Sequence, residues 1–248
     1  MSAAAHDSIP SATGPLLELD NVDAAYGPYR ALFGVSFEVH RGKATAVVGP
    51  NGAGKTTIAR VCSGLVKPTG GKVFFEGADI SAKPAFQIAR LGISHAPEGR
   101  SVFTTLTVEE NLKLEFQRAL PPSEVDAALG RAYELFPRLG ERRTQEAGTM
   151  SGGEQRMLSL ARVLVNPPKL LIADELGLGL APIVVDEVFG WLRTIREAGT
   201  SLIVIEEEVH RAIELADDVV VMLKGRVDWA GPKDDADDVV SRIMPATV

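Results

Sequence analysis

The amino-acid sequence predicts an α/β fold with a parallel core sheet, an antiparallel β segment beside it and an inserted helical segment. Three observations lead to this prediction. An apolar run at 44–48 leads through a glycine-rich loop into an apolar, helix-like stretch at 58–65. After residue 169, apolar strands alternate with helix-like stretches, which is the order typical of a parallel sheet. Between these regions lies a segment of about 83–166 in which the pattern becomes helical from Thr107 on.

The first ninety residues favour an antiparallel edge joined to the core sheet. Residues 16–22 and 35–40 alternate apolar and polar side chains, as half-buried strands do, and 72–76 reads as a further short strand. A turn at 25–29 separates the first two strands. Residues 1–15 are rich in Ala, Ser and Pro and lack the apolar core of a signal peptide, so we expect a disordered tail.

The middle of the chain predicts three helices. The first opens at Thr107, where Thr107 and Glu110 match a capping box. The second covers about 123–136 with one apolar face, and the third covers 151–165. We interpret residues 83–166 as a helical subdomain inserted into one domain that spans 16–231.

The last third of the chain supplies the rest of the parallel sheet. Its expected elements are strands at 169–174 and 201–205, helices at 182–198 and 209–216, and a hairpin of 218–223 with 226–230. The strand at 169–174 is continuously apolar, which is typical of a central parallel strand. Residues 232–248 are interpreted as a C-terminal extension.

Composition narrows the possible partners. The formal net charge of −7 argues against nucleic acid and leaves no polybasic membrane anchor. A single cysteine, Cys62, excludes a disulfide framework and fits a reducing compartment. The apolar runs fall far short of the roughly 20 residues that a membrane span needs. We therefore expect an intracellular protein whose membrane association depends on a partner.

The glycine-rich stretch fits the phosphate-binding pattern G-x-x-x-x-G-K-[ST] without a mismatch. Its residues are Gly49, Pro50, Asn51, Gly52, Ala53, Gly54, Lys55, Thr56 and Thr57. The glycines let successive N–H groups point inward, and the following helix start adds positive potential for an anion. We expect Lys55 to reach the β- and γ-phosphates, Thr56 to ligate Mg²⁺ and Thr57 to lie near the α-phosphate. This pattern predicts a nucleoside triphosphate site.

Two carboxylates, Asp174 and Glu175, end the strand at 169–174. In open α/β sheets, ligands bind at this end of the strands. Asp174 is expected to hold Mg²⁺ through water, and Glu175 to orient the water that attacks the γ-phosphate. The alternative is that these acids only cap the following helix.

A second glycine-containing helix start lies far from the first. It contributes Ser151, Gly152, Gly153 and Gln155. Free N–H groups and a serine hydroxyl can bind an anion, yet one subunit with a complete phosphate loop does not need a second such site. The simplest explanation is that this segment completes the site of another subunit. With the phosphate loop and the Asp-Glu pair in the same order, the chain resembles the ATP-binding subunit of an ABC transporter over about 16–231.

The resemblance implies a P-loop fold of the ABC type, with a RecA-like core sheet, an antiparallel β subdomain and an inserted helical subdomain. It implies that two ATPase subunits close head to tail on ATP and Mg²⁺, as a homodimer or with a related subunit. Ser151, Gly152, Gly153 and Gln155 would then contact the ATP of the facing subunit. Glu175 would be the catalytic residue, and 177–181 would face the dimer partner. Tyr26 would stack on adenine; the alternative is that it is a core-edge aromatic.

A narrower likeness is to the ATPases of branched-chain amino acid importers. It rests on the segments 96–103, 108–112, 133–139, 141–143, 148–150 and 178–182. The likeness implies docking on membrane permease subunits and import of branched-chain or other small amino acids. It also implies a cytoplasmic location, peripheral to the inner (plasma) membrane through the permease.

Four positions depart from the general ABC pattern. Glu98 replaces a glutamine that touches Mg²⁺, but its carboxylate can still ligate a hard cation. Glu207 stands where most ABC ATPases have a histidine beside the γ-phosphate. Leu176 replaces a proline and Gly177 replaces a serine directly after the catalytic glutamate. These departures leave open a regulatory or structural ATP-binding subunit with slow hydrolysis. A non-transport ABC ATPase is a further alternative.

Overall fold

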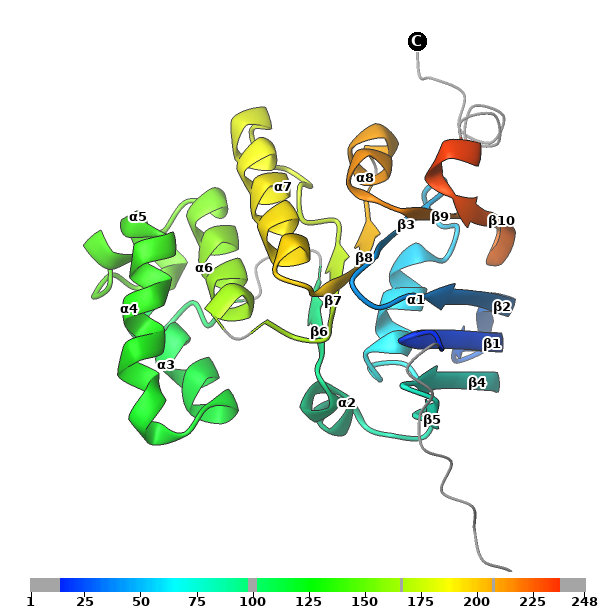
Figure 1. The fold of residues 1–248 in the computed structure, drawn as a ribbon, viewed down its shortest axis with the longest axis horizontal. Helices are drawn as coiled ribbons and strands as arrows, with labels where there is room; N and C mark the ends of the chain where they lie inside the picture. The colour runs from blue at the N-terminus through cyan, green and yellow to red at the C-terminus, as the bar shows by residue number, and fades with distance from the viewer. Residues whose placement is uncertain (1–13, 98–101, 166, 207, 237–248) are drawn as a thin grey trace, which may run out of the picture.

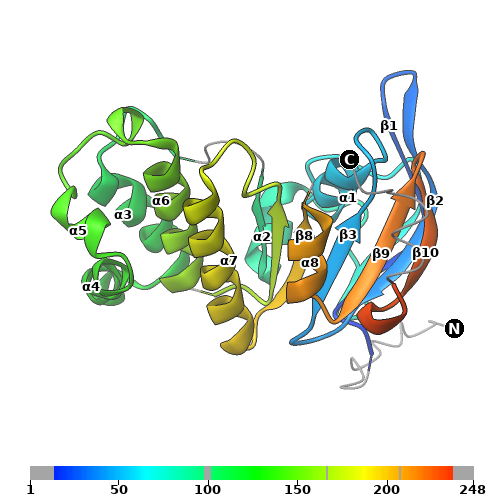
Figure 2. The same ribbon diagram turned by 90° about the horizontal axis from the view of Figure 1, so that it is seen from above.

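Two β-sheets and a layer of helices lie side by side, with the helical layer at one end and the antiparallel sheet at the other (Figures 1 and 2). The computed structural model describes residues 14–97, 102–165, 167–206 and 208–236. None of the helices in these ranges is long and apolar enough to cross a membrane. The fold is the expected α/β fold of a parallel core sheet, an antiparallel sheet and a helical segment.

The core sheet has six strands in the order β10-β9-β3-β8-β7-β6. The strands are β3 (Ala44–Val48), β6 (Ile93–Ala96), β7 (Leu170–Asp174), β8 (Ser201–Ile205), β9 (Asp218–Leu223) and β10 (Arg226–Pro232). All pairs are parallel except β9 with β10, which form the expected hairpin. Every residue of β3, β7 and β8 is buried, because both faces of the sheet are covered.

The antiparallel sheet has the order β2-β1-β4-β5. Its strands are β1 (Leu17–Tyr26), β2 (Tyr29–Val39), β4 (Gly70–Phe75) and β5 (Ala78–Asp79). The first two strands run further than predicted, so the expected turn at 25–29 shrinks to the two residues Gly27 and Pro28. Positive φ at Gly27, 56°, lets the chain reverse in so short a connection.

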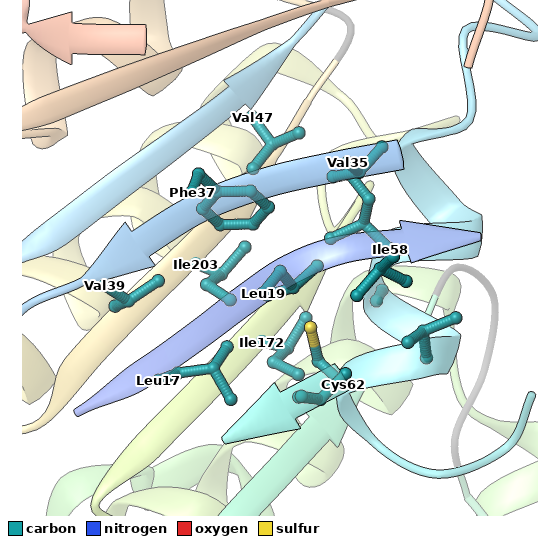
Figure 3. Packing of buried hydrophobic residues seen from close by; sticks show 14 of the residues in the cluster. Leu17, Leu19, Val35, Phe37, Val39, Val47, Ile58, Cys62, Ile172 and Ile203 are labelled. Carbon is teal, nitrogen blue, oxygen red and sulfur yellow. The ribbon is translucent and has the colours of Figure 1, made fainter. Parts of the chain in front are cut away.

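One face of the core sheet packs against the antiparallel sheet with α1 (Lys55–Cys62) between them. Figure 3 shows Leu19 and Phe37 of the antiparallel sheet among Ile58, Cys62, Ile172 and Ile203, which come from α1 and the core sheet. Burial raises the pKa of the Cys62 thiol to about 12, so it is an inert apolar filler.

The other face of the core sheet is covered by α7 (Pro182–Glu197), α8 (Val209–Leu215) and the C-terminal half of the last helix of the helical layer. That layer comprises α3 (Val108–Ala119), α4 (Val125–Leu135), α5 (Pro137–Glu141) and α6 (Gly152–Val165), with short 3-10 turns at Pro122–Glu124 and Ala147–Thr149. It has a core of its own, which includes Leu112, Phe116 and Leu139. Phe136 meets Trp191 of α7 edge to face with ring centroids 4.9 Å apart, which ties the layer to the rest of the molecule.

The start of the helical segment differs from the predicted 83. α2 (Ala85–Leu91) leads into β6, and β6 pairs with β7 as a strand of the core sheet. The helical layer therefore begins after Ala96. The strand was not predicted because it is short and contains Ser94 and His95, so it lacks the apolar run of the central strands.

Candidate functional site

The glycine loop joins β3 to α1 and is confined by its neighbours. A Cβ atom at Gly49, where φ is 153°, would lie 2.3 Å from the carbonyl oxygen of Met222 in β9. A Cβ atom at Gly54, where φ is 103°, would lie 2.9 Å from Leu32 Cδ2 in β2. Only glycine fits at either position, and the loop is thereby pressed between both sheets.

Lys55 is the first residue of α1 and only 4% exposed. Its Nζ donates to the carbonyl oxygen of Gly49 at 2.8 Å and lies 3.4 Å from that of Pro50. The ammonium group is therefore held inside the curve of the loop. Thr57 on the same helical turn is buried as well, and Thr56 is half-buried.

A cavity of about 390 Å³ opens over the loop. It is lined by Arg30, Ala31, Phe33, Asn51, Gly52, Gly54, Lys55, Thr56, Thr57, Glu175, Lys224 and Gly225. The cavity brings together the glycine loop and Glu175, which are about 120 residues apart in the chain. Its size is in the range of small-molecule sites, and three of its side chains are cationic.

Asp174 ends β7 and Glu175 follows it, at the edge of the sheet that carries the loop. Asp174 is fully buried, and its Oδ1 lies 3.4 Å from the hydroxyl of Thr56. Glu175 has a φ of 50°, a conformation that L-residues rarely adopt, and its N–H donates to the carbonyl oxygen of Ile205 at 2.8 Å. The left-handed backbone turns the chain out of the strand and places Glu175 in the wall of the cavity.

The residues present fit a magnesium ion. The Thr56 hydroxyl and the Asp174 carboxylate are hard oxygen donors on the same side of the cavity. Among the described residues, Asp174 Oδ2 is buried without a hydrogen-bond partner. No group of three or more His, Cys, Asp and Glu side chains that could hold a metal ion occurs in the described ranges. Glu98, the third predicted ligand, lies outside the described residues.

A second buried carboxylate, Glu206, lies at the end of β8 beside this site. It is 5% exposed, and its Oε1 accepts a hydrogen bond from the N–H of Gly177 at 3.2 Å. The pKa of Glu206 is raised to about 7, chiefly by burial; the charge of Glu175 adds to the rise, and the N–H groups of Gly177 and Leu176 oppose it. Glu206 thus braces the turn that follows Glu175. The predicted departure at Glu207 lies outside the described residues.

The second glycine-containing segment opens α6 on the helical layer. Ser151 is exposed, and its N–H and hydroxyl both donate to Glu154 Oε2 at 3.0 Å. In return the Glu154 N–H donates to Ser151 Oγ at 3.3 Å, which completes a capping box. Arg142 Nε lies 3.3 Å from Glu154 Oε1. Ser151, Gly152 and Gly153 are not in the lining of the cavity over the glycine loop.

Gln155 lies one turn further and points inward. It is fully buried, and its Nε2 donates to the carbonyl oxygens of Ala147 at 2.7 Å and Met150 at 3.2 Å. These bonds hold the chain that leads into Ser151. The predicted contact of Gln155 with nucleotide stays a prediction, and the structure adds a supporting role behind Ser151.

Tyr26 ends β1 and is 40% exposed. Its hydroxyl accepts a hydrogen bond from Arg60 Nη1 at 3.4 Å, and the Arg60 guanidinium lies 6.0 Å from the ring centroid. The ring is available for stacking, but it does not line the cavity over the loop. Its proposed contact with adenine also stays a prediction.

Sequence reasoning missed Arg30, Phe33 and Lys224, which line the cavity. They reach it because the β9–β10 hairpin touches both the loop and β2. The N–H of Gly225 donates to Ala53 at 2.9 Å, and the N–H of Phe33 donates to Gly225 at 2.9 Å. Lys224-Gly225 read only as a hairpin turn, and no local pattern indicates what such a turn packs against.

A glycine loop between strand and helix, with a buried lysine and a carboxylate pair across a cavity, defines a P-loop nucleotide-binding protein. The ABC transporter family model matches residues 32–176, so the chain belongs to that family. It is the ATP-binding subunit of an ABC transporter, and it binds and hydrolyses ATP.

Two curated relatives and one solved structure illustrate the similarity. BraG, a high-affinity branched-chain amino acid transport ATP-binding protein of Pseudomonas aeruginosa, is 40% identical over 86% of this chain and 91% of its own length. LivF of Archaeoglobus fulgidus, a probable protein of the same kind, is 34% identical over 87% of this chain and 92% of its own. The ADP conformation of an ABC transporter ATP-binding cassette superposes with a TM-score of 0.79 at 26% identity, covering 93% of this chain and 97% of the other.

Proposed function

We propose that this subunit powers an importer of branched-chain or other small amino acids. The observation that carries the proposal is the 40% identity to BraG along nearly the full length of both chains. Cargo contacts the membrane permease subunits and not the ATP-binding subunit. The helical layer is the part proposed to dock on the permease, so similarity that includes this layer supports the same class of permease and hence of cargo. The amino-acid segments that resemble such importers, for example 133–139 and 148–150, lie in that layer.

In the proposed mechanism the triphosphate enters the cavity over the glycine loop. Lys55 and the inward N–H groups bind the β- and γ-phosphates, and Thr56 with Asp174 would hold Mg²⁺. The bound ion would neutralise phosphate charge. Glu175 orients and polarises the water that attacks the γ-phosphate, from the wall of the same cavity.

The site is completed by a second subunit. Every residue that lines the cavity over the loop lies outside the helical layer. Ser151 with Gly152 and Gly153 instead forms an exposed helix start on that layer. Head-to-tail pairing of two such chains, or of this chain with a related one, would bring each Ser151 to the other's γ-phosphate.

Docking on membrane permease subunits is proposed for the groove between α2, β6 and the helical layer. This groove has a volume of about 720 Å³, and its wall includes Arg90, Phe103, Arg118, Arg162 and Lys169. Its lining includes Pro97 and Val102, the described residues on either side of 98–101, the segment of the sequence that contains Glu98 and Arg100. Such docking would hold the subunit on the cytoplasmic face of the inner membrane.

Uptake of radiolabelled leucine tests the proposal. In a source strain that lacks this subunit, the unchanged chain should restore uptake, and unlabelled isoleucine or valine should compete. Glu175→Gln, a matched variant that keeps size and hydrogen bonding, should lower ATP turnover by about 10²- to 10⁴-fold and abolish uptake. Restoration by Glu175→Gln would contradict the motor function. ATP turnover without any effect on amino acid uptake would contradict the cargo class.

A further inference from the structure

Three polar side chains from three elements meet under the nucleotide site. His95 lies on β6, Asp174 ends β7, and Ser63 follows α1. His95 Nδ1 lies 3.2 Å from Ser63 Oγ, and His95 Nε2 lies 3.6 Å from Asp174 Oδ2. The side chains of His95 and Asp174 are only 7% and 1% exposed.

The two facing atoms lack other partners. Within the described part of the chain, neither His95 Nε2 nor Asp174 Oδ2 makes a hydrogen bond. Their separation of 3.6 Å is longer than a hydrogen bond and within the distance of an ion pair. A buried polar atom without a partner is costly, which favours an attraction between these two atoms.

The neighbours of the ring select the proton position. The single proton of the Ser63 hydroxyl has three acceptors within reach: Ala59 O at 2.8 Å, Arg60 O at 3.3 Å and His95 Nδ1 at 3.2 Å. Donation to Nδ1 leaves the proton of a neutral ring on Nε2, where it points at Asp174 Oδ2. Donation to either carbonyl would instead make Nδ1 the donor and set an Nε2 lone pair against a carboxylate oxygen in a buried place, which is unfavourable.

We infer that His95 is a positioning residue, which holds Asp174 Oδ2 so that Oδ1 faces the hydroxyl of Thr56. The inference rests on the proposed placement of Mg²⁺ at Thr56 and Asp174. Outer partners of this kind orient a metal-binding carboxylate and raise its affinity for the ion. His95 also lines the groove of about 720 Å³, so its ring lies between that groove and the nucleotide site.

Binding of a non-hydrolysable ATP analogue to the full chain, titrated with Mg²⁺ and repeated in EDTA, tests this role. His95→Leu removes the N–H donor and should raise the Mg²⁺ concentration for half-maximal enhancement by about tenfold. Affinity in EDTA should stay within about twofold of the unchanged chain, since the effect acts through the ion. His95→Gln restores an N–H donor and should recover most of the loss. Ser63→Ala, which frees the ring, should give an intermediate shift.

Two results would overturn the inference. One is an unchanged Mg²⁺ dependence in both His95→Leu and Ser63→Ala. The other is an equal loss in His95→Leu and His95→Gln that persists in EDTA, which is the pattern of a packing defect. Asp174→Asn distinguishes a failure of the proposed ion site from a failure of the role proposed for His95. If it alters the Mg²⁺ dependence and His95→Leu does not, only the role of His95 is wrong. If Asp174→Asn has no effect, the proposed ion site is wrong and the role of His95 falls with it.

Discussion

Glu206 is a carboxylate whose burial shifts its protonation into the physiological range. Its pKa of about 7 lies above the ordinary 4.5 because burial disfavours the charged form. The folded chain therefore binds this proton more tightly than the unfolded chain does. The stabilising contribution is fully present below about pH 4.5 and is lost as pH rises through about 7. The difference amounts to the order of 3 kcal/mol.

Glu206→Gln removes this titration and keeps an oxygen that can accept from the Gly177 N–H. Between pH 5 and pH 8, the free energy of unfolding of the unchanged chain should fall relative to that of Glu206→Gln by up to about 3 kcal/mol. Denaturant unfolding at several pH values measures the difference, and other titrating groups cancel in it. Parallel pH profiles of the two proteins would show that Glu206 titrates near its ordinary value.

At the level of single residues, the sequence identified those residues of the site that are adjacent in the chain and form a local motif. The glycine loop with Lys55, and the pair Asp174 and Glu175, were found from the sequence and lie around one cavity or beneath it. Lys224 and His95 were not found, because their roles come from strands that meet only after folding. The buried position of Gln155 was also not predicted, since a helix start gives no direction for a side chain one turn later.

At the level of elements, α3 and α6 begin with the same capping box. Thr107 Oγ1 accepts from Glu110 N–H at 3.2 Å and donates to Glu110 Oε2 at 2.9 Å. Ser151 makes the equivalent bonds to Glu154 at 3.3 and 3.0 Å. This match allows the capping role of Ser151 to be separated from its proposed role at the partner's nucleotide.

Thr107→Ala and Ser151→Ala should each lower the free energy of unfolding by about 1 kcal/mol, because each removes a cap. Only Ser151→Ala should also lower ATP turnover, by about tenfold or more, through loss of a hydroxyl that faces phosphate. Denaturant unfolding and steady-state ATPase assays measure the two effects. Equal turnover in both variants would show that Ser151 serves only to start α6.

Elements with a long periodic or continuous apolar pattern were predicted well. β8 occupies the predicted 201–205, and α7 ends one residue before the predicted 198. The pattern did not identify β6, which has mixed composition and depends on its pairing with β7. The strands β1 and β2 also exceed their predicted lengths, because tertiary pairing continues past the point where side-chain alternation stops.

At the level of the whole molecule, apolar side chains on the segment that follows Glu175 remain exposed. Leu178 follows Glu175 closely and is 45% exposed, and Ile183 at the start of α7 is 71% exposed. In Figure 1 the C-terminal ends of β7 and β8 and the N-terminal end of α7 lie toward the same side of the molecule. These side chains suit the proposed dimer face, since burying them on pairing is favourable.

Ile183→Glu in a Glu175→Gln background should therefore weaken the dimer formed with ATP and Mg²⁺ by at least about tenfold, or 1.4 kcal/mol. Burial of an unpaired carboxylate is the reason. Sedimentation over a range of concentrations measures the association. Leu135→Glu is the matched control, because Leu135 is 49% exposed on α4 in the helical layer and should leave the dimer intact. A monomeric Glu175→Gln chain at high concentration with ATP and Mg²⁺ would contradict the dimer itself.

The close packing around the glycine loop affects both the free energy of nucleotide binding and the substitutions that the loop can accept. The carbonyl of Met222 lies against one side of the loop and Leu32 against the other, so the backbone of the loop is held in one conformation. An arriving triphosphate meets a cradle that is already shaped, so little free energy is spent on ordering the backbone. The same close packing restricts substitution in the loop, because a side chain at Gly49 would require the hairpin behind it to move.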